Sequence, residues 1–194
     1  MLNKIILASK SRVRKDILDN NNIPNEVKPS NVDEDQVKDS LVKENVTPEI
    51  ISKNLAELKA NKISLKESDR FVLGADSIID LEGELISKPI DREEAFLILK
   101  KLNGKKHYLI SSVCISKNGS MIWNHTDKAI LTMKRFSDED LIKYLSKISD
   151  EALYAYNVYQ IEGEGKKLFS KIQGNENTIM GLPVEKIKEY LIKT

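Results

Sequence analysis

The sequence predicts an α/β fold in which a mixed β-sheet is flanked by helices. Strand-like apolar runs alternate with helical segments, which is the pattern of strand-helix units. Residues 71–79 are apolar nearly throughout, as in a strand covered on both faces. Residues 107–116 and 121–133 flank Asn118-Gly119 and predict a long β-hairpin with a type I′ turn. Such a sheet contains parallel and antiparallel strands.

The first third of the chain is expected to hold two strands and two helices. Residues 5–7 form an apolar run that leads through small polar residues into a helix that includes Ile17. Residues 27–30 are typical of a second strand. Pro48 suits the first position of another helix, which carries Lys59. The apolar face of that helix is expected to consist of Ile51, Leu55 and Leu58.

The elements after residue 90 have clear boundary signals. Asp91 and Glu94 match an N-cap and its capping partner, which predicts a helix over residues 91–103. After the hairpin, Ser137 is expected to cap a further helix. Two short strands and a final helix that begins near Pro183 complete the alternating pattern.

Composition argues against nucleic-acid-binding, disulfide-bonded and membrane-spanning classes of protein. The 194 residues and 22.0 kDa favour one domain over residues 1–194. Lys plus Arg (31) nearly balance Asp plus Glu (30), and the aromatic residues show no stacking pattern, so no nucleic acid partner is expected. Cys114 is the only cysteine, which excludes an internal disulfide and favours a reducing cytoplasm. No run approaches the ~20 apolar residues that cross a bilayer, so neither a membrane partner nor a signal peptide is expected.

Residues 7–14 predict an anion-binding site. A strand that ends in small hydroxyl residues before a helix leaves the first N–H groups of that helix unpaired. Side chains of the same stretch would add donors: Ser9, Lys10, Ser11, Arg12 and Arg14. The guanidinium of Arg14 offers a planar fork for phosphate oxygens. The alternative is that Ser11 only caps the helix and the basic residues form a solvated face.

Acidic residues supply the other candidates. Asp76 lies within an apolar strand, where a carboxylate is costly unless it meets a cation, a metal or several donors. It could serve as a general base or an Mg²⁺ ligand, or pair with a lysine at a strand end. Asp33-Glu34-Asp35 could help to hold Mg²⁺, or form the acidic first turn of a helix. Lys59 and Lys88 could each meet a phosphate or lie exposed on the surface.

Taken together, these segments resemble the Maf family of nucleoside triphosphate pyrophosphatases over essentially the whole chain. The motifs occur in the order of the family, and each is weak alone. The matching segments are Leu7-Ala8-Ser9-Lys10-Ser11 with Arg14 (family pattern L-A-S-x-S-P-R-R), Val32-Asp33-Glu34 (D-E), Leu55-Ala56 with Lys59-Ala60 (L-A-x-x-K-A), Gly74-Ala75-Asp76-Ser77 (G-A-D-T), Lys88-Pro89 with Glu94-Ala95 (K-P-x-x-x-x-E-A), Leu102-Asn103-Gly104 with His107 (L-S-G-x-x-H) and Gly181-Leu182-Pro183 (G-L-P).

The resemblance implies an elongated central sheet of the Maf/ITPase-like kind and a hydrolase that acts on acid anhydrides. Such an enzyme converts nucleoside triphosphates, including modified ones, to a monophosphate and pyrophosphate with Mg²⁺ or Mn²⁺. By resemblance, the catalytic residues would be Asp76, Glu34 and Lys88. Asp76 would accept the proton, Glu34 would be a metal or water partner, and Lys88 would act on the phosphate side. Asp76 and Glu34 would hold the metal. The substrate-binding residues would be Ser9, Ser11, Arg14, Lys59 and Gln160. A cytoplasmic homodimer is also implied.

Two departures from the family pattern leave questions open. Arg12 and Val13 stand where Pro and the first Arg are usual, so Arg12 is a candidate substitute for the missing cation. Residues 159–163, Y-Q-I-E-G, resemble a Maf-like subgroup in which some relatives prefer methylated guanine nucleotides to dTTP and UTP. The alternative function is a nucleotide-binding regulator of cell division or septum formation, with little or no turnover.

Overall fold

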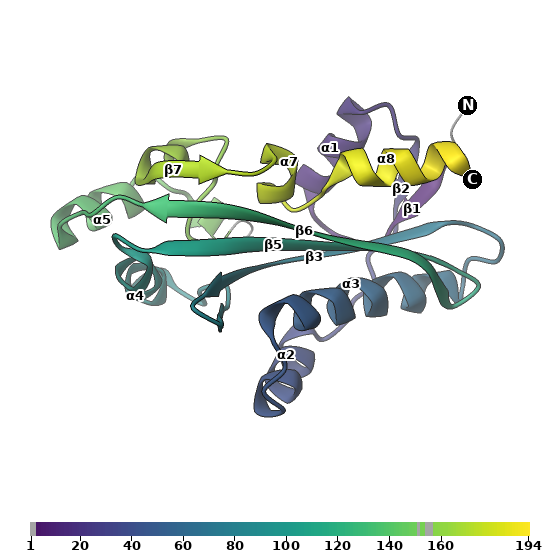
Figure 1. The fold of residues 1–194 in the computed structure, drawn as a ribbon, viewed down its shortest axis with the longest axis horizontal. Helices are drawn as coiled ribbons and strands as arrows, with labels where there is room; N and C mark the ends of the chain where they lie inside the picture. The colour runs from purple at the N-terminus through teal and green to yellow at the C-terminus, as the bar shows by residue number, and fades with distance from the viewer. Residues whose placement is uncertain (1–2, 151, 154–156) are drawn as a thin grey trace.

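The structure is a computed structural model that describes residues 3–150, 152–153 and 157–194. A long twisted sheet is flanked by helices, with α3 along one side of the long strands and α1, α7 and α8 on the other (Figure 1). The elements are β1 (Ile5–Leu7), α1 (Arg12–Asn20), β2 (Asn25–Val27), α2 (Glu34–Lys43), α3 (Pro48–Ser64), β3 (Val72–Leu81), β4 (Glu84–Ile86), α4 (Arg92–Leu102), β5 (Lys106–Lys117), β6 (Ser120–Met133), α5 (Asp138–Leu145), the 3-10 helix η1 (Glu164–Leu168), β7 (Phe169–Gln173), α7 (Glu176–Ile179) and α8 (Val184–Lys193).

The sheet is mixed, as predicted. Its strand order is β2-β1-β3-β5-β6-β7, and β4 also pairs with β3. β1 is parallel to both β2 and β3, whereas β3, β5, β6 and β7 form an antiparallel series. The expected hairpin is present, and its turn residues Asn118 and Gly119 have φ values of 50° and 82°. A type I′ turn requires positive φ at both of these positions.

Several predicted element boundaries are confirmed. Asp91 caps α4 through a bond from Glu94 N to its Oδ1 of 2.8 Å, and Ser137 caps α5. Asp33 caps α2, so the acidic triplet does form the first turn of a helix. Acidic side chains are stabilising there because they face the positive end of the helix dipole.

Three predictions are wrong. The second strand covers Asn25–Val27, not 27–30, because β1 offers only three partners and Pro29 has no N–H for a ladder. Leu58 is 39% exposed, since Ala56 and Ala60 make the close contact of α3 with the sheet. Between α5 and α8, the described residues contain one strand, β7, with η1 directly before it and α7 after it.

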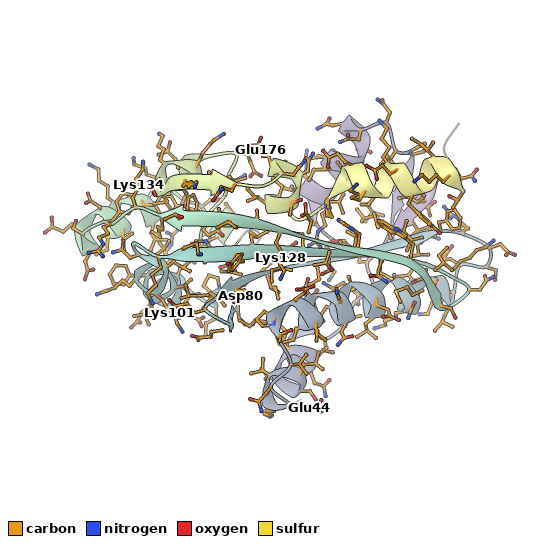
Figure 2. The ribbon with its side chains drawn as sticks, viewed as in Figure 1. Glu44, Asp80, Lys101, Lys128, Lys134 and Glu176 are labelled. Atoms are coloured by element: carbon orange, nitrogen blue, oxygen red, sulfur yellow. The ribbon has the colours of Figure 1, made fainter. Side chains whose placement is uncertain are left out.

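The hydrophobic interior is divided between two main clusters. One surrounds α4, α5 and the adjoining ends of β5 and β6. The other packs β1, α1 and α8 against the opposite end of β3 and β5. Charged side chains of both signs cover the outside, including the labelled Glu44, Lys101, Lys134 and Glu176 in Figure 2. None of the helices in the described ranges is both long enough and apolar enough to cross a bilayer.

The outer edge of β3 is unpaired in its middle. β1 pairs with residues 72 and 73, and β4 pairs with residues 79–81. No described strand covers the edge between them, so the backbone of residues 74–78 is open to side chains on that side. Asp76 and Ser77 lie in this stretch and point to opposite faces of the sheet, because side chains alternate along a strand. The gap therefore allows both faces to contribute to one site.

Candidate active site

A cavity of about 670 Å³ lies at the gap in the edge of β3. Every residue predicted to take part in catalysis or binding lines it, although these residues come from segments far apart in the sequence. The residues in question are Ser9, Ser11, Arg14, Glu34, Lys59, Asp76, Lys88 and Gln160. The fold thus brings the predicted set together in one place.

An ionic cluster around Lys59 forms part of the cavity lining. Its Nζ lies 2.8 Å from Oδ1 of Asp76 and 2.9 Å from Oε1 of Glu34. The side chains of Lys59 and Asp76 are each 5% exposed, whereas that of Glu34 is 42% exposed. Oδ2 of Asp76 is buried and has no hydrogen-bond partner among the described residues. The buried carboxylate is therefore paired on one oxygen and keeps acceptor capacity on the other.

Glu34 reaches this cluster from the first turn of α2. Burial alone would raise the pKa of its carboxyl, but the Lys59 ammonium, with Lys38 and Arg14 nearby, outweighs burial and lowers the pKa. Glu34 is thus an anion at neutral pH. Lys38, four residues later on the same helix, also lines the cavity. Lys38 was not among the predicted residues, although its i, i+4 spacing from Glu34 places both side chains on one face of a helix.

Gly74 explains how Lys59 comes so close to Asp76. A Cβ at position 74 would lie 2.1 Å from the carbonyl oxygen of Ala56 and 2.8 Å from the amide nitrogen of Ala60. The absence of a side chain lets α3 lie directly on β3. Lys59, between the two alanines in sequence, then extends from the closest part of the helix to the strand. The glycine of the G-A-D segment is required by packing.

Arg14 lies in the cavity, but its guanidinium is largely engaged by the protein. Its Nε donates to Gly181 O at 3.0 Å, and one Nη1 hydrogen donates to Ala75 O at 2.9 Å. The other Nη1 contact is Ser9 Oγ at 3.3 Å, and Nη2 donates to Ser77 Oγ at 3.1 Å. Of the hydrogens on the fork, only one on Nη2 is left by these bonds. A bidentate grip on phosphate, as the sequence suggested, would require Arg14 to release a protein partner.

The N-terminal end of α1 presents hydroxyl and backbone donors to the same cavity. Ser11 caps the helix and accepts a bond from Arg14 N at 3.3 Å. The capping interpretation is therefore right, and Ser11 lines the cavity as well. The side chain of Arg12 is 91% exposed and lies 3.8 Å from Asp16. In this arrangement Arg12 directs its charge to the surface and does not replace the guanidinium missing at position 13.

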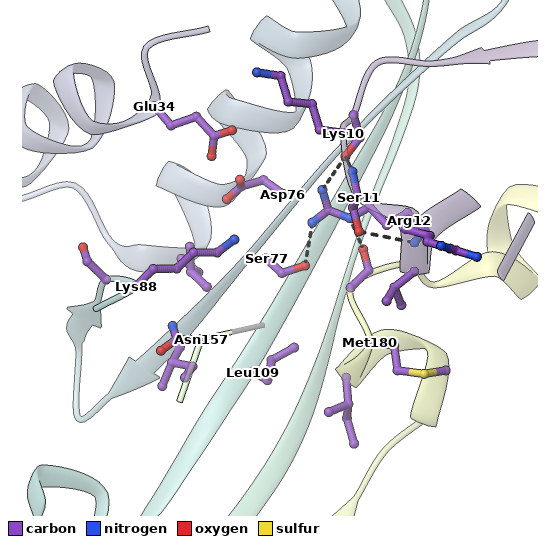
Figure 3. Close-up of a pocket in the computed structure, with 18 of the residues that line it drawn as sticks. Lys10, Ser11, Arg12, Glu34, Asp76, Ser77, Lys88, Leu109, Asn157 and Met180 are labelled. Carbon is purple, nitrogen blue, oxygen red and sulfur yellow. Dashed lines mark hydrogen bonds between the residues drawn. The ribbon is translucent and has the colours of Figure 1, made fainter. Parts of the chain in front are cut away.

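Lys88 approaches Asp76 from the loop after β4. Figure 3 shows the side chains of Glu34 and Lys88 on either side of the Asp76 carboxylate. Lys88 is an exposed residue overall, but it also lines the cavity. Removal from water lowers the pKa of Lys88, and the nearby Arg14 lowers it further against the opposing effect of Glu34.

The far end of the cavity is built by residues 157–163. Tyr159 is 5% exposed, and its hydroxyl lies 3.0 Å from Nε2 of the buried His107. The Tyr144 hydroxyl donates to Val158 O at 3.1 Å. A Cβ on Gly165 would lie 2.6 Å from both N and O of Gln160. These contacts fix the backbone that presents Gln160 and Glu162 to the cavity.

A mixed α/β sheet whose edge cavity combines paired carboxylates, cations and a helix N-terminus defines a protein suited to phosphate-rich ligands. The fold is similar to the "HAM1 protein from Coxiella burnetii", with a TM-score of 0.53 and 12% identity over 100% of both chains. The chain belongs to the Maf family, because the model described as "Maf-like protein" matches residues 4–194.

The curated relatives extend over nearly the full chain. A "Nucleoside triphosphate pyrophosphatase" of Pelagibacter ubique is 72% identical over 98% of this chain and 98% of its own. A "Nucleoside triphosphate pyrophosphatase" of Roseobacter denitrificans is 37% identical over 96% of this chain and 94% of its own. A "7-methyl-GTP pyrophosphatase" of Brucella abortus is 37% identical over 93% of this chain and 91% of its own.

Proposed function

We propose that this protein is a nucleoside triphosphate pyrophosphatase. It hydrolyses the bond between the α- and β-phosphates and releases a nucleoside monophosphate and pyrophosphate. The observation that carries the proposal is the buried Asp76 carboxylate, with one oxygen on Lys59 and the other without a partner among the described residues, inside a cavity rich in cations. The names of the relatives in Pelagibacter ubique and Roseobacter denitrificans support it.

The proposed reaction needs a positioned water, a proton acceptor and cations around the phosphoryl oxygens. The water oxygen bonds to the α-phosphorus while the bond from that phosphorus to the bridging oxygen breaks. Pyrophosphate leaves with the bridging oxygen, and the proton of the water passes to Oδ2 of Asp76. Lys59 holds Oδ1 of the same carboxylate, which keeps Oδ2 directed away from the pair. Asp76 therefore acts as the general base.

The carboxylates also fit a divalent cation. Mg²⁺ is commonly held by one or two carboxylates together with substrate phosphates and water. Oδ2 of Asp76 has two lone pairs, so one would hold the ion together with the half-exposed Glu34 while the other accepts the proton of the water. The described residues contain no cluster of three or more metal-ligating side chains, so phosphates and water would complete the coordination. When bound, the ion would neutralise charge on the phosphates.

The triphosphate is held by donors from three segments. The first N–H groups of α1 and the hydroxyls of Ser9 and Ser11 face it from one side. Lys88 and Lys38 bring ammonium groups from the other segments. These donors stabilise the charge that develops on the phosphoryl oxygens as the bond to the leaving group breaks. Lys88 is thereby assigned to catalysis as well as to binding.

The base is expected to lie at the far end, beside Gln160 and Glu162. The relative in Brucella abortus carries the name of a 7-methyl-GTP pyrophosphatase. We therefore include methylated guanine nucleotides among the substrates to be tested. The homodimer, the metal and the cytoplasmic location stay predictions.

The test is pyrophosphate release from a panel of canonical and methylated nucleoside triphosphates, each with Mg²⁺, with Mn²⁺ and with a chelator. We expect metal-dependent turnover, with one class of base clearly preferred. Tight binding of a triphosphate without release of pyrophosphate would overturn the proposal and would favour a nucleotide-binding regulator of cell division.

A further inference from the structure

Four serine hydroxyls lie around Arg14, two of them in contact with its guanidinium, and they differ in where their hydrogens are directed. Ser77 follows Asp76 on β3, and its Oγ accepts a bond from Nη2 of Arg14 at 3.1 Å. The same Oγ lies 2.9 Å from Oγ of Ser111, the residue that pairs with Ser77 across the β3–β5 ladder. Ser111 is completely buried.

The direction of this chain of bonds is fixed at its far end. The Ser111 hydroxyl donates to the backbone carbonyl of Thr178 at 2.7 Å, and a carbonyl can only accept. Because a serine hydroxyl has one hydrogen, Ser111 must accept from Ser77 and cannot donate to it. Ser77 in turn has given its hydrogen to Ser111 and accepts from Arg14. The chain therefore runs one way, from the guanidinium to α7.

The chain closes into a ring through the α7–α8 connection. Gly181 N donates to Thr178 O at 3.1 Å, while Gly181 O accepts from Nε of Arg14 at 3.0 Å. Two edges of the guanidinium are thus tied to the same short segment. A Cβ on Gly181, whose φ is +95°, would lie 2.8 Å from Ser77 Oγ. The orientation of Arg14 beside Asp76 is set by residues that are far away in sequence.

Ser9 and Ser11 are arranged differently. Ser9 Oγ accepts from Ser11 N at 3.2 Å and from Arg14 at 3.3 Å, and Ser11 Oγ accepts from Arg14 N. Neither hydroxyl donates to a partner among the described residues, so each keeps its hydrogen for a ligand. Both line the cavity.

We propose that Ser77 and Ser111 are positioning residues that orient Arg14, whereas Ser9 and Ser11 donate directly to the triphosphate. The proposal rests on the proposed function, and it divides the serines of the site into two roles. Ser77 has no hydrogen to offer a phosphate oxygen, although it stands in the cavity next to the general base. Arg14, held by four protein acceptors, presents its remaining Nη2 hydrogen to the substrate.

A double-mutant cycle with Arg14→Lys tests the two roles. Lysine cannot reproduce the planar fork, so residues that act only through Arg14 lose their effect in that background. We expect Ser77→Ala and Ser111→Ala each to lower kcat/KM about 10-fold in the parent, and less than about 2-fold beside Arg14→Lys. Ser9→Ala should lower kcat/KM in both backgrounds.

The matched control is Ser116→Ala. Ser116 is also buried on β5 and donates to a side chain, Asn61 Oδ1 at 2.7 Å, but it does not line the cavity. Its loss should leave kcat and KM unchanged while costing comparable stability.

Equal losses for Ser77→Ala in both backgrounds would overturn the proposal, because they would mean direct contact with substrate. No loss in the parent would overturn it as well. If Ser111→Ala does not fold, the double-mutant cycle is carried out with Ser77→Ala and Arg14→Lys, since Ser77 is only half buried.

Failure of the proposed function gives a different result. If the parent protein releases no pyrophosphate, the same variants are compared by the Kd of a non-hydrolysable α,β-methylene triphosphate. Coupling of Ser77 with Arg14 in Kd would support the division of roles without turnover. Additive effects on Kd would overturn it.

Discussion

Asp76 and Lys59 form an ion pair of 2.8 Å that is almost completely removed from water. Each charge depends on the other, because an isolated charge in this position would be costly to bury. The pair is not symmetric, however. Lys59 has a second anion, Glu34, at 2.9 Å, whereas Asp76 has Lys59 as its only ion-pair partner among the described side chains. Removing one partner or the other therefore has different consequences.

Replacement of Asp76 by Asn should abolish most of the activity and leave the fold intact. Lys59 keeps its contact with Glu34, and the amide oxygen can still accept from the ammonium. The loss of the general base should lower kcat by about 10²–10⁴-fold, measured by pyrophosphate release. Asp80→Asn is the control, because Asp80 lies on the same strand outside the cavity and accepts from Gly83 N. Turnover at the parental rate in Asp76→Asn would remove Asp76 from this role.

Replacement of Lys59 by Met should be much more damaging to stability. The apolar stem is retained, but the buried Asp76 carboxylate loses its cation. We expect a loss of about 3–5 kcal/mol in the free energy of unfolding, measured by denaturant titration. Lys62→Met is the control on the same helix, since Lys62 makes an exposed bond to Asn31 O. A loss no larger than that of Asp76→Asn would contradict the asymmetry of the cluster.

Replacement of Gly74 by Ala should separate α3 from β3. The added Cβ would meet backbone atoms of α3, which cannot move aside as a flexible side chain can. We expect a loss of about 1–3 kcal/mol in stability together with reduced kcat, because Lys59 withdraws from Asp76. Gly83→Ala is the comparison: its φ of +91° makes alanine strained, but nothing lies within 4 Å. That variant should lose stability and keep its kinetic constants.

Replacement of Lys88 by Ala should impair the reaction without unfolding the protein. The lysine lies in a loop on the wall of the cavity, opposite Glu34 in the view of Figure 3. Loss of its charge should raise KM, lower kcat or do both, because the ammonium would face the phosphates of the proposed substrate. The measurement is steady-state kinetics of Lys88→Ala. The control is Lys101→Ala, which removes a surface lysine on α4. Unchanged constants in Lys88→Ala would exclude it from the site.

Mild acid should destabilise the protein through His107. Burial lowers the pKa of this histidine to about 4, below its ordinary value near 6.5. Between these values the unfolded chain binds a proton that the folded chain does not. The contribution of neutral His107 to the free energy of unfolding is therefore complete above about pH 6.5 and is lost as the pH falls toward 4.

The expected loss between about pH 7.5 and about pH 5 is roughly 2 kcal/mol in the free energy of unfolding. Carboxylates contribute little in that interval, because their ordinary pKa values lie near 4. The comparison is His107→Gln, which carries no titrating group and should show a much flatter profile. The same slope in both proteins would exclude His107 as the cause.

Local features of the sequence predicted much of the fold. The caps of α4 and α5, the turn at Asn118-Gly119 and the strand around Asp76 all depend on residues close together in the chain. All of the predicted catalytic and substrate-binding residues line the cavity, although other lining residues such as Lys38 were not predicted. Leu58 was misplaced because helical spacing alone does not show that Gly74 allows the alanines of α3 to make the contact.

What could not be predicted depends on which strands lie side by side. The hairpin of β5 and β6 follows from its turn, but the pairing of β3 with β5 places Ser111 beside Ser77 and is a long-range contact. The engagement of Arg14 by Gly181 likewise joins residues from the two ends of the chain. The sequence motif at residues 7–14 therefore suggested a phosphate clamp where the structure has a largely satisfied guanidinium.

The residues that line the cavity are supported by two separate apolar clusters. Arg14 lies on α1 and Ser9 lies between β1 and α1, which both pack into one cluster with α8, while Tyr159 belongs to the cluster around α4 and α5. A nucleotide that fills the cavity would place its phosphates against residues supported by the first cluster and its base against residues supported by the second. Neither cluster alone would then support binding of the whole nucleotide. A core substitution within either cluster would weaken nucleotide binding without contacting the nucleotide.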